Sequence, residues 1–241
     1  MFGLGTLINT VAIILGGVFG GLFGKLLKER HQDSLQKACG ITVLFVAVGG
    51  VLEGMLTVEN GSVVSGRALL LVTCLALGAL VGETVNFEHW FERFGEWLKQ
   101  KTGNSKDARF VDGFVTASLT VCIGAMAIVG AIEDGINGNY SILLTKSILD
   151  LIVIMVMTCS LGKGCTFSAI PVFLLQGSVT VLAVLIKPLM TEAALGNLSL
   201  VGNVLIFCVG INLVWGKKVR VANLLPAIIF AAAAAFLPFS L

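Results

Sequence analysis

The sequence is poor in charge and in histidine, and these shortages exclude several classes of protein. Only 12% of its 241 residues are Asp, Glu, Lys or Arg, against roughly 25% in a soluble domain. This composition excludes a soluble globular enzyme and a disordered chain. The two histidines, His31 and His89, lie in charged segments, so neither an HExxH metal site nor a membrane-embedded serine–histidine pair can form.

The sequence also lacks a disulfide or metal-binding pattern of cysteines. No two of the six cysteines form a CxxC pair, and most of them lie in apolar runs, which is typical of small packing residues. The net charge is only +2, so charge gives no reason to expect nucleic acid as a partner. We therefore expect no metal, no cofactor and no nucleic-acid partner.

Long hydrophobic runs dominate the rest of the chain. Hydrophobic residues make up 56% of it, and 29 further residues are glycine. Because a spanning helix needs about 20 apolar residues and lipid offers no partner to exposed backbone, continuous apolar runs predict membrane helices. We predict an all-α fold, a polytopic transmembrane helical bundle in which residues 1–241 form a single integral membrane domain. Eight spans are expected: Gly3–Gly24, Ala38–Thr57, Ala68–Val85, Gly113–Ile132, Ser141–Leu161, Phe167–Ile186, Leu200–Trp215 and Val221–Phe239.

The basic residues predict how this bundle is oriented in the lipid bilayer. When the loops are assigned alternately to the two sides, 13 of the 16 Lys and Arg residues fall on one side. Only Arg67, Lys146 and Lys187 fall on the other side. Cytoplasmic loops carry the excess of Lys and Arg, so both termini are predicted to lie outside.

The longest predicted loop, residues 86–112, begins with an amphipathic segment. Its apolar residues follow the spacing of one helix face: Phe87, Trp90, Phe91, Phe94, Trp97 and Leu98. Two interpretations remain open for this cytoplasmic helix. It lies along the membrane surface, or it docks on the protein's own loops.

The first three predicted spans resemble the last three. Residues 38–49 are similar to residues 200–210, and each segment is followed by an arginine, Arg67 or Arg220, before another apolar helix. Because the offset is five helices, the two copies would cross the membrane in opposite senses. Inverted repeats of this kind are common in secondary transporters, whose substrate sites lie near the bilayer midplane.

Asp150 is the outstanding polar residue of the spans. It lies near the middle of Ser141–Leu161, and Lys146 lies one turn away on the same helix face. An ionisable side chain in lipid costs about 2.5–3.5 kcal/mol on insertion scales. Either Asp150 binds a coupling ion or proton with Lys146 as its tuning partner, or the two residues form a buried structural ion pair. The first interpretation requires Asp150 to face a vestibule or tunnel.

Other polar residues within the spans are candidate ligands for a substrate or an ion: Asn9, Gln176, Ser178 and Asn212. Each of them fits an interhelical hydrogen bond equally well, worth about 0.6 kcal/mol on average. Glu133 and Asp134 are candidate entrance residues for cations, although a solvated helix end explains them too. Pro171 and Pro226 predict interrupted sixth and eighth helices, because proline removes a backbone donor.

Glycine is arranged for close helix packing in the first span. Gly16, Gly20 and Gly24 form a GxxxGxxxG row, and Gly17 with Gly21 adds a second row. Small residues at this spacing let two helix backbones approach closely. The sequence leaves open whether these faces pack within one chain or join two copies in a homo-oligomer.

Several segments resemble one known family over essentially the whole chain: residues 5–10, 121–135, 145–150, 167–171, 176–178 and 221–227. The segments GAMAIVGAIEDG and VANLLPA are the most specific of them. Through these motifs the chain resembles the domain of unknown function 554 family of bacterial inner-membrane proteins. The resemblance implies a multi-pass protein of the bacterial plasma membrane, and it implies no substrate or reaction.

The sequence favours a small secondary transporter or ion-conducting protein for an unidentified small solute. The observations behind this hypothesis are the Asp150–Lys146 pair, the repeat, the interrupted helices and the lack of room for a soluble catalytic domain. A non-catalytic membrane scaffold or partner subunit is the alternative. An intramembrane enzyme is less favoured, because no second central carboxylate is available to pair with Asp150, and we expect no enzymatic activity.

Overall fold

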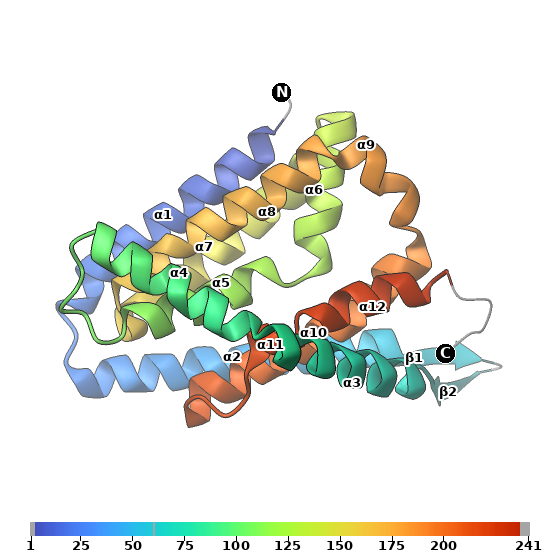
Figure 1. The fold of residues 1–241 in the computed structure, drawn as a ribbon, viewed down its shortest axis with the longest axis horizontal. Coiled ribbons are helices and arrows are strands. Elements are labelled where there is room, and N and C mark those ends of the chain that lie inside the picture. The colour runs from blue at the N-terminus through green and yellow to red at the C-terminus, as the bar shows by residue number, and fades with distance from the viewer. Residues whose placement is uncertain (1–2, 60, 237–241) are drawn as a thin grey trace.

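A computed structural model describes residues 3–59 and 61–236 of the chain (Figure 1). The described residues are predominantly helical, which confirms the predicted all-α class. The α-helices are α1 (Leu4–Gly24), α2 (Glu29–Met55), α3 (Ala68–Val85), α4 (Phe87–Lys101), α5 (Phe110–Cys122), α6 (Ala125–Asn137), α7 (Ser141–Leu161), α8 (Ala169–Val181), α9 (Ala183–Ile186), α10 (Glu192–Trp215), α11 (Val221–Leu224) and α12 (Pro226–Ala234). The remaining elements are two 3₁₀ helices, η1 (Lys163–Ser168) and η2 (Lys187–Leu189), and two strands, β1 (Leu56–Glu59) and β2 (Ser62–Ser65).

Six helices of the described part are long and apolar enough to cross a membrane: α1, α2, α3, α7, η1 with α8, and α10. A seventh span results if the bent pair α5 and α6 is counted as one. The apolar segment Val221–Ala234 is shorter than these spans, and residues 237–239 of the predicted eighth span lie outside the described residues. The count of eight spans is therefore not confirmed.

The fourth predicted span differs from the expected single helix. Within Gly113–Ile132 the chain divides into α5 and α6, which meet at an angle of 62°. Gly124 lies between them with a φ of 145°, a backbone conformation that is essentially restricted to glycine. The flanking residues are all apolar, so composition alone predicts one continuous helix here.

Several helix ends also differ from the predicted bounds. The second and seventh spans begin earlier than expected, at Glu29 and Glu192, because polar turns extend these helices beyond their apolar runs. After Met55 the chain forms the antiparallel hairpin β1–β2, with Val58 opposite Val63. Pro226 begins α12 after a break, as predicted for the last span, and Pro171 lies in the first turn of α8, where a helix tolerates proline.

The bundle has two groups of helices. One group contains α1, α7, α8 and α6, and the other contains α2, α10, α3 and α12 (Figure 1). In the first group α1 and α7 run parallel, since Gly5 approaches Leu143 and Gly24 approaches Cys159. In the second group α2 and α10 run antiparallel, since Gly40 approaches Val214 and Gly54 approaches Leu200.

The predicted glycine row of α1 packs within the chain. A Cβ atom on Gly16 would clash with the Leu151 carbonyl oxygen, and one on Gly20 would clash with the Met155 carbonyl oxygen. Glycine therefore sets the distance between α1 and α7. Gly21, on the second row, has no atom within 4 Å of such a Cβ atom.

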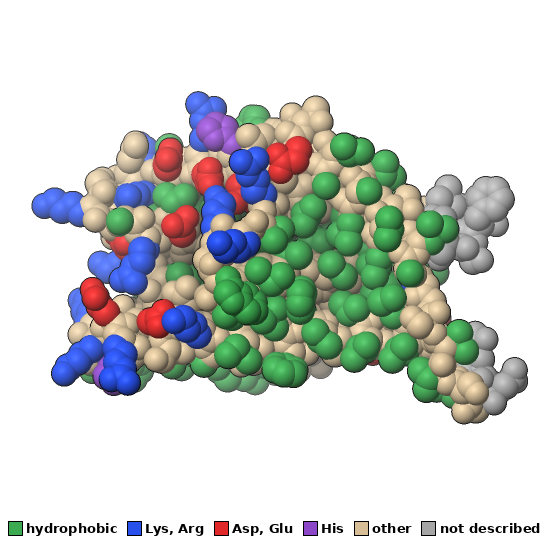
Figure 2. All heavy atoms as spheres, turned by 90° about the horizontal axis from the view of Figure 1, so that it is seen from below, with side chains coloured by type: hydrophobic (Ala, Val, Ile, Leu, Met, Phe, Trp, Pro, Cys, Tyr) green, Lys and Arg blue, Asp and Glu red, His purple; other side chains and the backbone are tan. Residues whose placement is uncertain are grey.

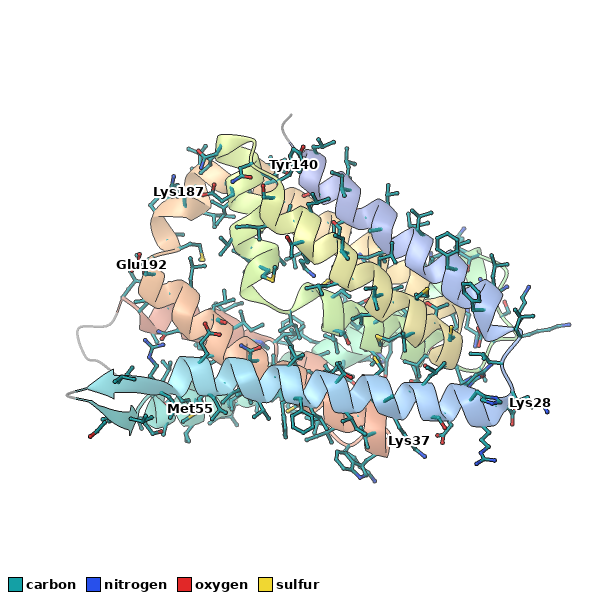
Figure 3. All side chains as sticks on the ribbon, turned by 180° about the vertical axis from the view of Figure 1, so that it is seen from behind. Lys28, Lys37, Met55, Tyr140, Lys187 and Glu192 are labelled. Carbon is teal, nitrogen blue, oxygen red and sulfur yellow. The ribbon has the colours of Figure 1, made fainter. Side chains whose placement is uncertain are left out.

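Charged residues gather at one end of the bundle (Figure 2). Lys28 and Lys37 lie toward one end of the view in Figure 3, Met55, Lys187 and Glu192 lie toward the other, and Tyr140 lies at the upper edge where α7 begins. Large apolar side chains are exposed along the helices between these ends, for example Phe45, Val72 and Val184. Exposed apolar surface on this scale fits contact with lipid rather than with water.

Helix α4 docks on the protein and also keeps an exposed aromatic edge. Leu98 is buried, and the Phe94 ring lies 5.8 Å from the Phe114 ring of α5. Trp90 and Trp97 remain exposed. The docked interpretation of this segment thus holds for one face, and the exposed aromatic face remains available to a membrane surface.

Candidate functional site

The centre of the candidate site is the ion pair between Lys146 and Asp150 on α7. The Lys146 Nζ atom lies 2.8 Å from Oδ1 and 2.6 Å from Oδ2 of Asp150. Only 7% of Lys146 and 6% of Asp150 are exposed. The spacing of four residues along one helix face brings the two groups together, as the sequence predicted.

Two amides from neighbouring helices complete this cluster. Asn9 of α1 donates from Nδ2 to Asp150 Oδ2 at 3.0 Å, and from the same Nδ2 to Gln176 Oε1 of α8 at 3.3 Å. A carboxylate only accepts hydrogen bonds, so Asn9 must present its NH₂ group to it. Gln176 must then present its oxygen to that NH₂ group. The chemistry thus fixes the orientation of both amides.

This arrangement leaves two polar atoms of the cluster without a partner. Asn9 is 0% exposed and Gln176 is 1% exposed. Among the described residues, no group hydrogen-bonds to Asn9 Oδ1 or to Gln176 Nε2. Buried polar atoms are normally paired with protein or with ordered water. The cluster therefore has one acceptor and one donor left for a small polar species.

Polar groups continue from this cluster toward the end of the bundle where α1 begins. Thr6 and Thr180 lie with their Oγ1 atoms 3.3 Å apart, one turn above Asn9 and Gln176. Asp134 of α6 lies next in line, where its Oδ2 atom accepts from the Gly5 backbone N–H at 2.9 Å. Asp134 was predicted at an entrance, and the structure places it fully buried. Its neighbour Glu133 lies at the surface and accepts from Asn137.

An apolar cavity lies beside the break between α5 and α6. It has a volume of about 520 Å³ and is almost entirely apolar, with Ser118 and Ser178 as its polar side chains. Its rim opens toward the lipid-facing surface, because Leu174 is 60% and Ile229 is 72% exposed. Ser118 is buried, and its Oγ atom has no partner among the described residues.

An ion-binding Asp150 is expected to face a vestibule or tunnel, and the described cavities do not meet this expectation. Five cavities in residues 3–59 and 61–236 are lined by other residues and not by Asp150, Lys146, Asn9 or Gln176. Ser178 lines the apolar cavity and bonds to the Leu175 carbonyl. It follows Gln176 by two residues and so points away from the cluster.

Asn212 lies apart from the other predicted ligands, at the charged end of α10. Its Oδ1 atom accepts from the backbone N–H groups of Lys218 and Val219 at 2.8 and 2.9 Å, and its Nδ2 atom donates to the Val219 carbonyl at 2.7 Å. These bonds occupy the amide, and they hold the turn between α10 and α11. The structure therefore gives Asn212 a role in loop geometry.

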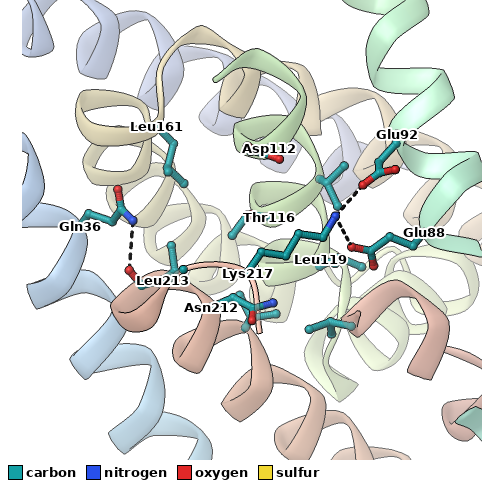
Figure 4. Close-up of a pocket in the computed structure, with 14 residues that line it drawn as sticks. Gln36, Glu88, Glu92, Asp112, Thr116, Leu119, Leu161, Asn212, Leu213 and Lys217 are labelled. Carbon is teal, nitrogen blue, oxygen red and sulfur yellow. Dashed lines mark hydrogen bonds and ion pairs between the residues drawn. The ribbon is translucent and has the colours of Figure 1, made fainter. Parts of the chain in front are cut away.

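A second, polar cavity of about 160 Å³ lies at this charged end (Figure 4). Lys217 projects between Glu88 and Glu92 of α4, with Nζ to carboxylate-oxygen distances of 2.9 and 2.5 Å. Burial lowers the pKa of Lys217, but the hydrogen bonds that Lys217 donates to Glu92 and Glu88 outweigh burial and leave this pKa above its usual value. Leu119 lines both this cavity and the apolar one, so the two cavities adjoin along α5.

Glu88 is a residue that sequence reasoning did not single out. It is buried, its Oε2 atom accepts from the Ala222 backbone N–H at 3.2 Å, and its own backbone N–H donates to Asn223 Oδ1 at 2.7 Å. These reciprocal bonds join the first turns of α4 and α11 in the manner of a capping box. The available signal was its position one turn before Glu92 and beside the aromatic face.

The fold defines the class of protein to which the chain belongs, and the comparisons define its family. A bundle of six or seven apolar helices of membrane length, with charge gathered at one end, is a multi-pass membrane protein. Residues 4–236 match the family described as "Protein of unknown function (DUF554)", and the chain belongs to this family.

Two relatives cover nearly the whole chain. The "Uncharacterized membrane protein YdfK" of Bacillus subtilis (strain 168) is 31% identical over 225 residues, which cover 93% of this chain and 92% of the relative. The "Uncharacterized protein YqgA" of Escherichia coli (strain K12) is 30% identical over 232 residues, which cover 95% of this chain and 94% of the relative. No solved structure matches the chain.

Proposed function

We propose that the protein is a small secondary transporter or ion-conducting protein of the bacterial inner membrane, in which Asp150 binds the coupling ion. Because none of the described cavities reaches Asp150, the vestibule that this requires must open in a second conformation, as alternating access demands. The observation that carries this proposal is the buried cluster of one ion pair and two amides contributed by α1, α7 and α8. Ionisable residues at this depth are costly and commonly mark ion or proton pathways.

The unpartnered amide atoms favour an exchanging site over a purely structural pair. A structural ion pair gains most when every remaining lone pair and proton is hydrogen-bonded. Here Asn9 Oδ1 and Gln176 Nε2 have no partner among the described residues, and leaving such atoms unpaired costs roughly 1–3 kcal/mol each. A proton, a water molecule or a small ion entering the cluster would remove part of this cost.

In this proposal the solute and the coupling ion use opposite sides of α8. The apolar cavity lies along one side of this helix at Ser178, and the charged cluster lies along the other at Gln176. A small rotation or shift of α8 therefore acts on both sites at once. Interrupted helices beside the binding site are a recurring feature of secondary transporters, and the break between α5 and α6 lies on this cavity.

The inverted repeat and the orientation belong to the same proposal. The predicted counterpart helices pack against each other in pairs, α1 with α8, α2 with α10, and α3 with α12. The Lys- and Arg-rich end is assigned to the cytoplasm. A reporter that is active only on the non-cytoplasmic side of the membrane should then be active when it is fused to the N-terminus.

A thermal-shift screen of the purified protein tests the proposal. The protein is heated with sodium, potassium, protons at several pH values, amino acids, polyamines and organic acids, and a bound species raises the unfolding temperature in proportion to RT ln(1 + [L]/Kd). Asp150→Asn keeps the size of the side chain and removes its charge. Asp33→Asn is the matched control, because Asp33 forms an exposed ion pair with Lys37 at the same spacing of four residues.

We expect a stabilising species that loses its effect in Asp150→Asn and keeps it in Asp33→Asn. That species should then drive a current or uptake in vesicles containing the wild-type protein and not the Asp150→Asn variant. Stabilisation and uptake that persist unchanged in Asp150→Asn would remove Asp150 from the mechanism. A lack of any ligand response, together with a stably co-purifying membrane protein, would favour the scaffold alternative.

A further inference from the structure

A line of buried polar groups runs along α1 from Asp134 to Asp150. Its members are Asp134, the Gly5 backbone N–H, the Thr6–Thr180 pair, Asn9 with Gln176, and Asp150. Thr6 and Asn9 lie three residues apart, and Thr180 and Gln176 lie four apart, so each pair occupies one face of its helix. Thr10 is the other polar residue of this part of α1, and its hydroxyl donates to the Thr6 carbonyl.

The unpartnered buried atoms concentrate on this line. Six buried side-chain atoms of the described residues have no hydrogen-bond partner, and three of these are Asp134 Oδ1, Asn9 Oδ1 and Gln176 Nε2. All three side chains are at most 1% exposed. Buried polar atoms in such a row are the places where internal water molecules bind, typically through two to four hydrogen bonds each.

Of the two carboxylates on this line, Asp134 lies nearer to the end of the bundle where α1 begins. It lies one turn before the end of α6 at Asn137, and Asn139 and Tyr140, which follow, are exposed. Figure 3 shows Tyr140 at the upper edge where α7 begins, away from Lys28 and Lys37. None of the ion pairs in the described residues includes Asp134.

We propose that this line is the access path of a coupling proton, with Asp134 as its outer proton-binding group and Asp150 as its inner one. This inference rests on the proposed function and names the coupling ion and its side of entry. A proton from the aqueous phase binds Asp134 at Oδ1, while Oδ2 stays bonded to Gly5. When the proton leaves, Asp134 returns to its carboxylate form. The proton is passed along the Thr6–Thr180 hydroxyls through bound water and binds the Asp150 carboxylate. Protonation of Asp150 releases Lys146 from its ion pair. No electrons are transferred.

The test is a pH jump applied to vesicles adsorbed on a solid-supported membrane, which records the charge displaced as protons enter the protein. Asp134→Asn retains an oxygen to accept from the Gly5 N–H and cannot carry a proton. Asp33→Asn is the control, because Asp33 is an exposed carboxylate on α2, which contributes nothing to this line. Asp150→Asn removes the inner group, and Thr180→Val removes one hydroxyl without changing charge. The unfolding temperature of each variant is measured in parallel.

We expect a transient current in the wild type and in Asp33→Asn, its loss in Asp134→Asn and Asp150→Asn, and a slower rise in Thr180→Val. Asp150→Asn should unfold at a lower temperature than the wild type, because it leaves Lys146 buried without its counter-ion, and the other variants should unfold near the wild-type temperature. A full current in Asp134→Asn that is lost in Asp150→Asn overturns the path and leaves the proposed function standing. A current retained in both variants, or absent in the wild type, overturns the path and proton coupling through Asp150 together. If Asp134→Asn does not fold, an unchanged rise in Thr180→Val overturns the path.

Discussion

The Nδ2 atom of Asn9 lies 3.0 Å from the Oδ2 atom of Asp150, and this hydrogen bond joins α1 to α7 at the level of the buried ion pair. Both oxygens of the same carboxylate accept hydrogen bonds from the Lys146 ammonium group. The charge of Asp150 is therefore balanced within its own helix, and its position is set by a second helix. Removing one member of this set should have a very different effect from removing both charges.

The buried pair predicts a large loss of stability when one partner is removed. Lys146→Met should lower the free energy of unfolding by about 3–5 kcal/mol, because it leaves the Asp150 charge buried without a cation. The double variant Lys146→Met/Asp150→Leu should be close to the wild type, since apolar residues of similar size often replace a buried pair at no cost. Unfolding in denaturant, followed by circular dichroism, measures both variants.

The exposed Lys37–Asp33 pair on α2 is the control for this prediction. Its ammonium-to-carboxylate distance is 2.8 Å, and both side chains are more than half exposed. Lys37→Met should change the free energy of unfolding by less than about 1 kcal/mol. Equal losses for Lys37→Met and Lys146→Met would contradict the assignment of a buried, desolvated pair on α7.

The close approach of α1 and α7 predicts that even a methyl group is not tolerated there. Gly16→Ala should lower the free energy of unfolding by about 1–3 kcal/mol, because its Cβ atom meets the Leu151 carbonyl and forces the helices apart. Gly21→Ala is the matched control, since its Cβ atom has free space. The control should be neutral or slightly stabilising, because alanine favours a helix over glycine by roughly 1 kcal/mol. A thermal-unfolding comparison decides, and two equal effects would argue against this packing.

Lys217 predicts a pH-dependent contribution to the docking of α4. Its pKa is raised in the folded protein by Glu92 and Glu88, which outweigh burial. The stabilisation is therefore fully present below the unfolded pKa of about 10.4, and it is lost as the pH rises through the higher folded pKa. Half of the Lys217 side chain is exposed, so the contribution should stay below about 1 kcal/mol and shrink in salt.

The measurement compares the unfolding temperatures of the wild type and Lys217→Met at neutral and at strongly alkaline pH. We expect the wild type to be more stable at neutral pH and the difference to disappear at alkaline pH. Lys218→Met, at the exposed neighbouring position, should show no such pH dependence. A difference between wild type and Lys217→Met that is the same at both pH values would contradict an ion-pair origin.

The sequence predicts the membrane helices well where apolar runs coincide with whole helices. The predicted bounds Ala68–Val85 and Ser141–Leu161 are those of α3 and α7, and Gly3–Gly24 differs from α1 by one residue. Lipid requires apolar side chains and a helical backbone in the same segment, so an apolar run predicts the helix. The break at Gly124 escapes this argument, because nothing in an apolar run distinguishes a glycine that bends the chain from one that packs.

The contacts of the site are less predictable than its members. Lys146 and Asp150 share one helix, and their spacing alone brings them together. Asn9 and Gln176 lie on other helices that are apolar on nearly all sides, so no amphipathic pattern shows which face of α1 or α8 meets α7. This is why Gln176 and Ser178 look equivalent in the sequence, although only Gln176 reaches the cluster.

The break itself predicts a specific sensitivity at Gly124. Gly124→Ala should lower the free energy of unfolding by about 1–3 kcal/mol, because a Cβ atom is strained at a φ of 145° although it meets no atom within 4 Å. Gly66→Ala separates backbone strain from the mere addition of a methyl group, since Gly66 also has free space but lacks a positive φ. Thermal unfolding of both variants measures the difference. If the two variants are equally stable, α5 and α6 form a straight span that accepts alanine, and the apolar cavity beside their junction loses its structural basis.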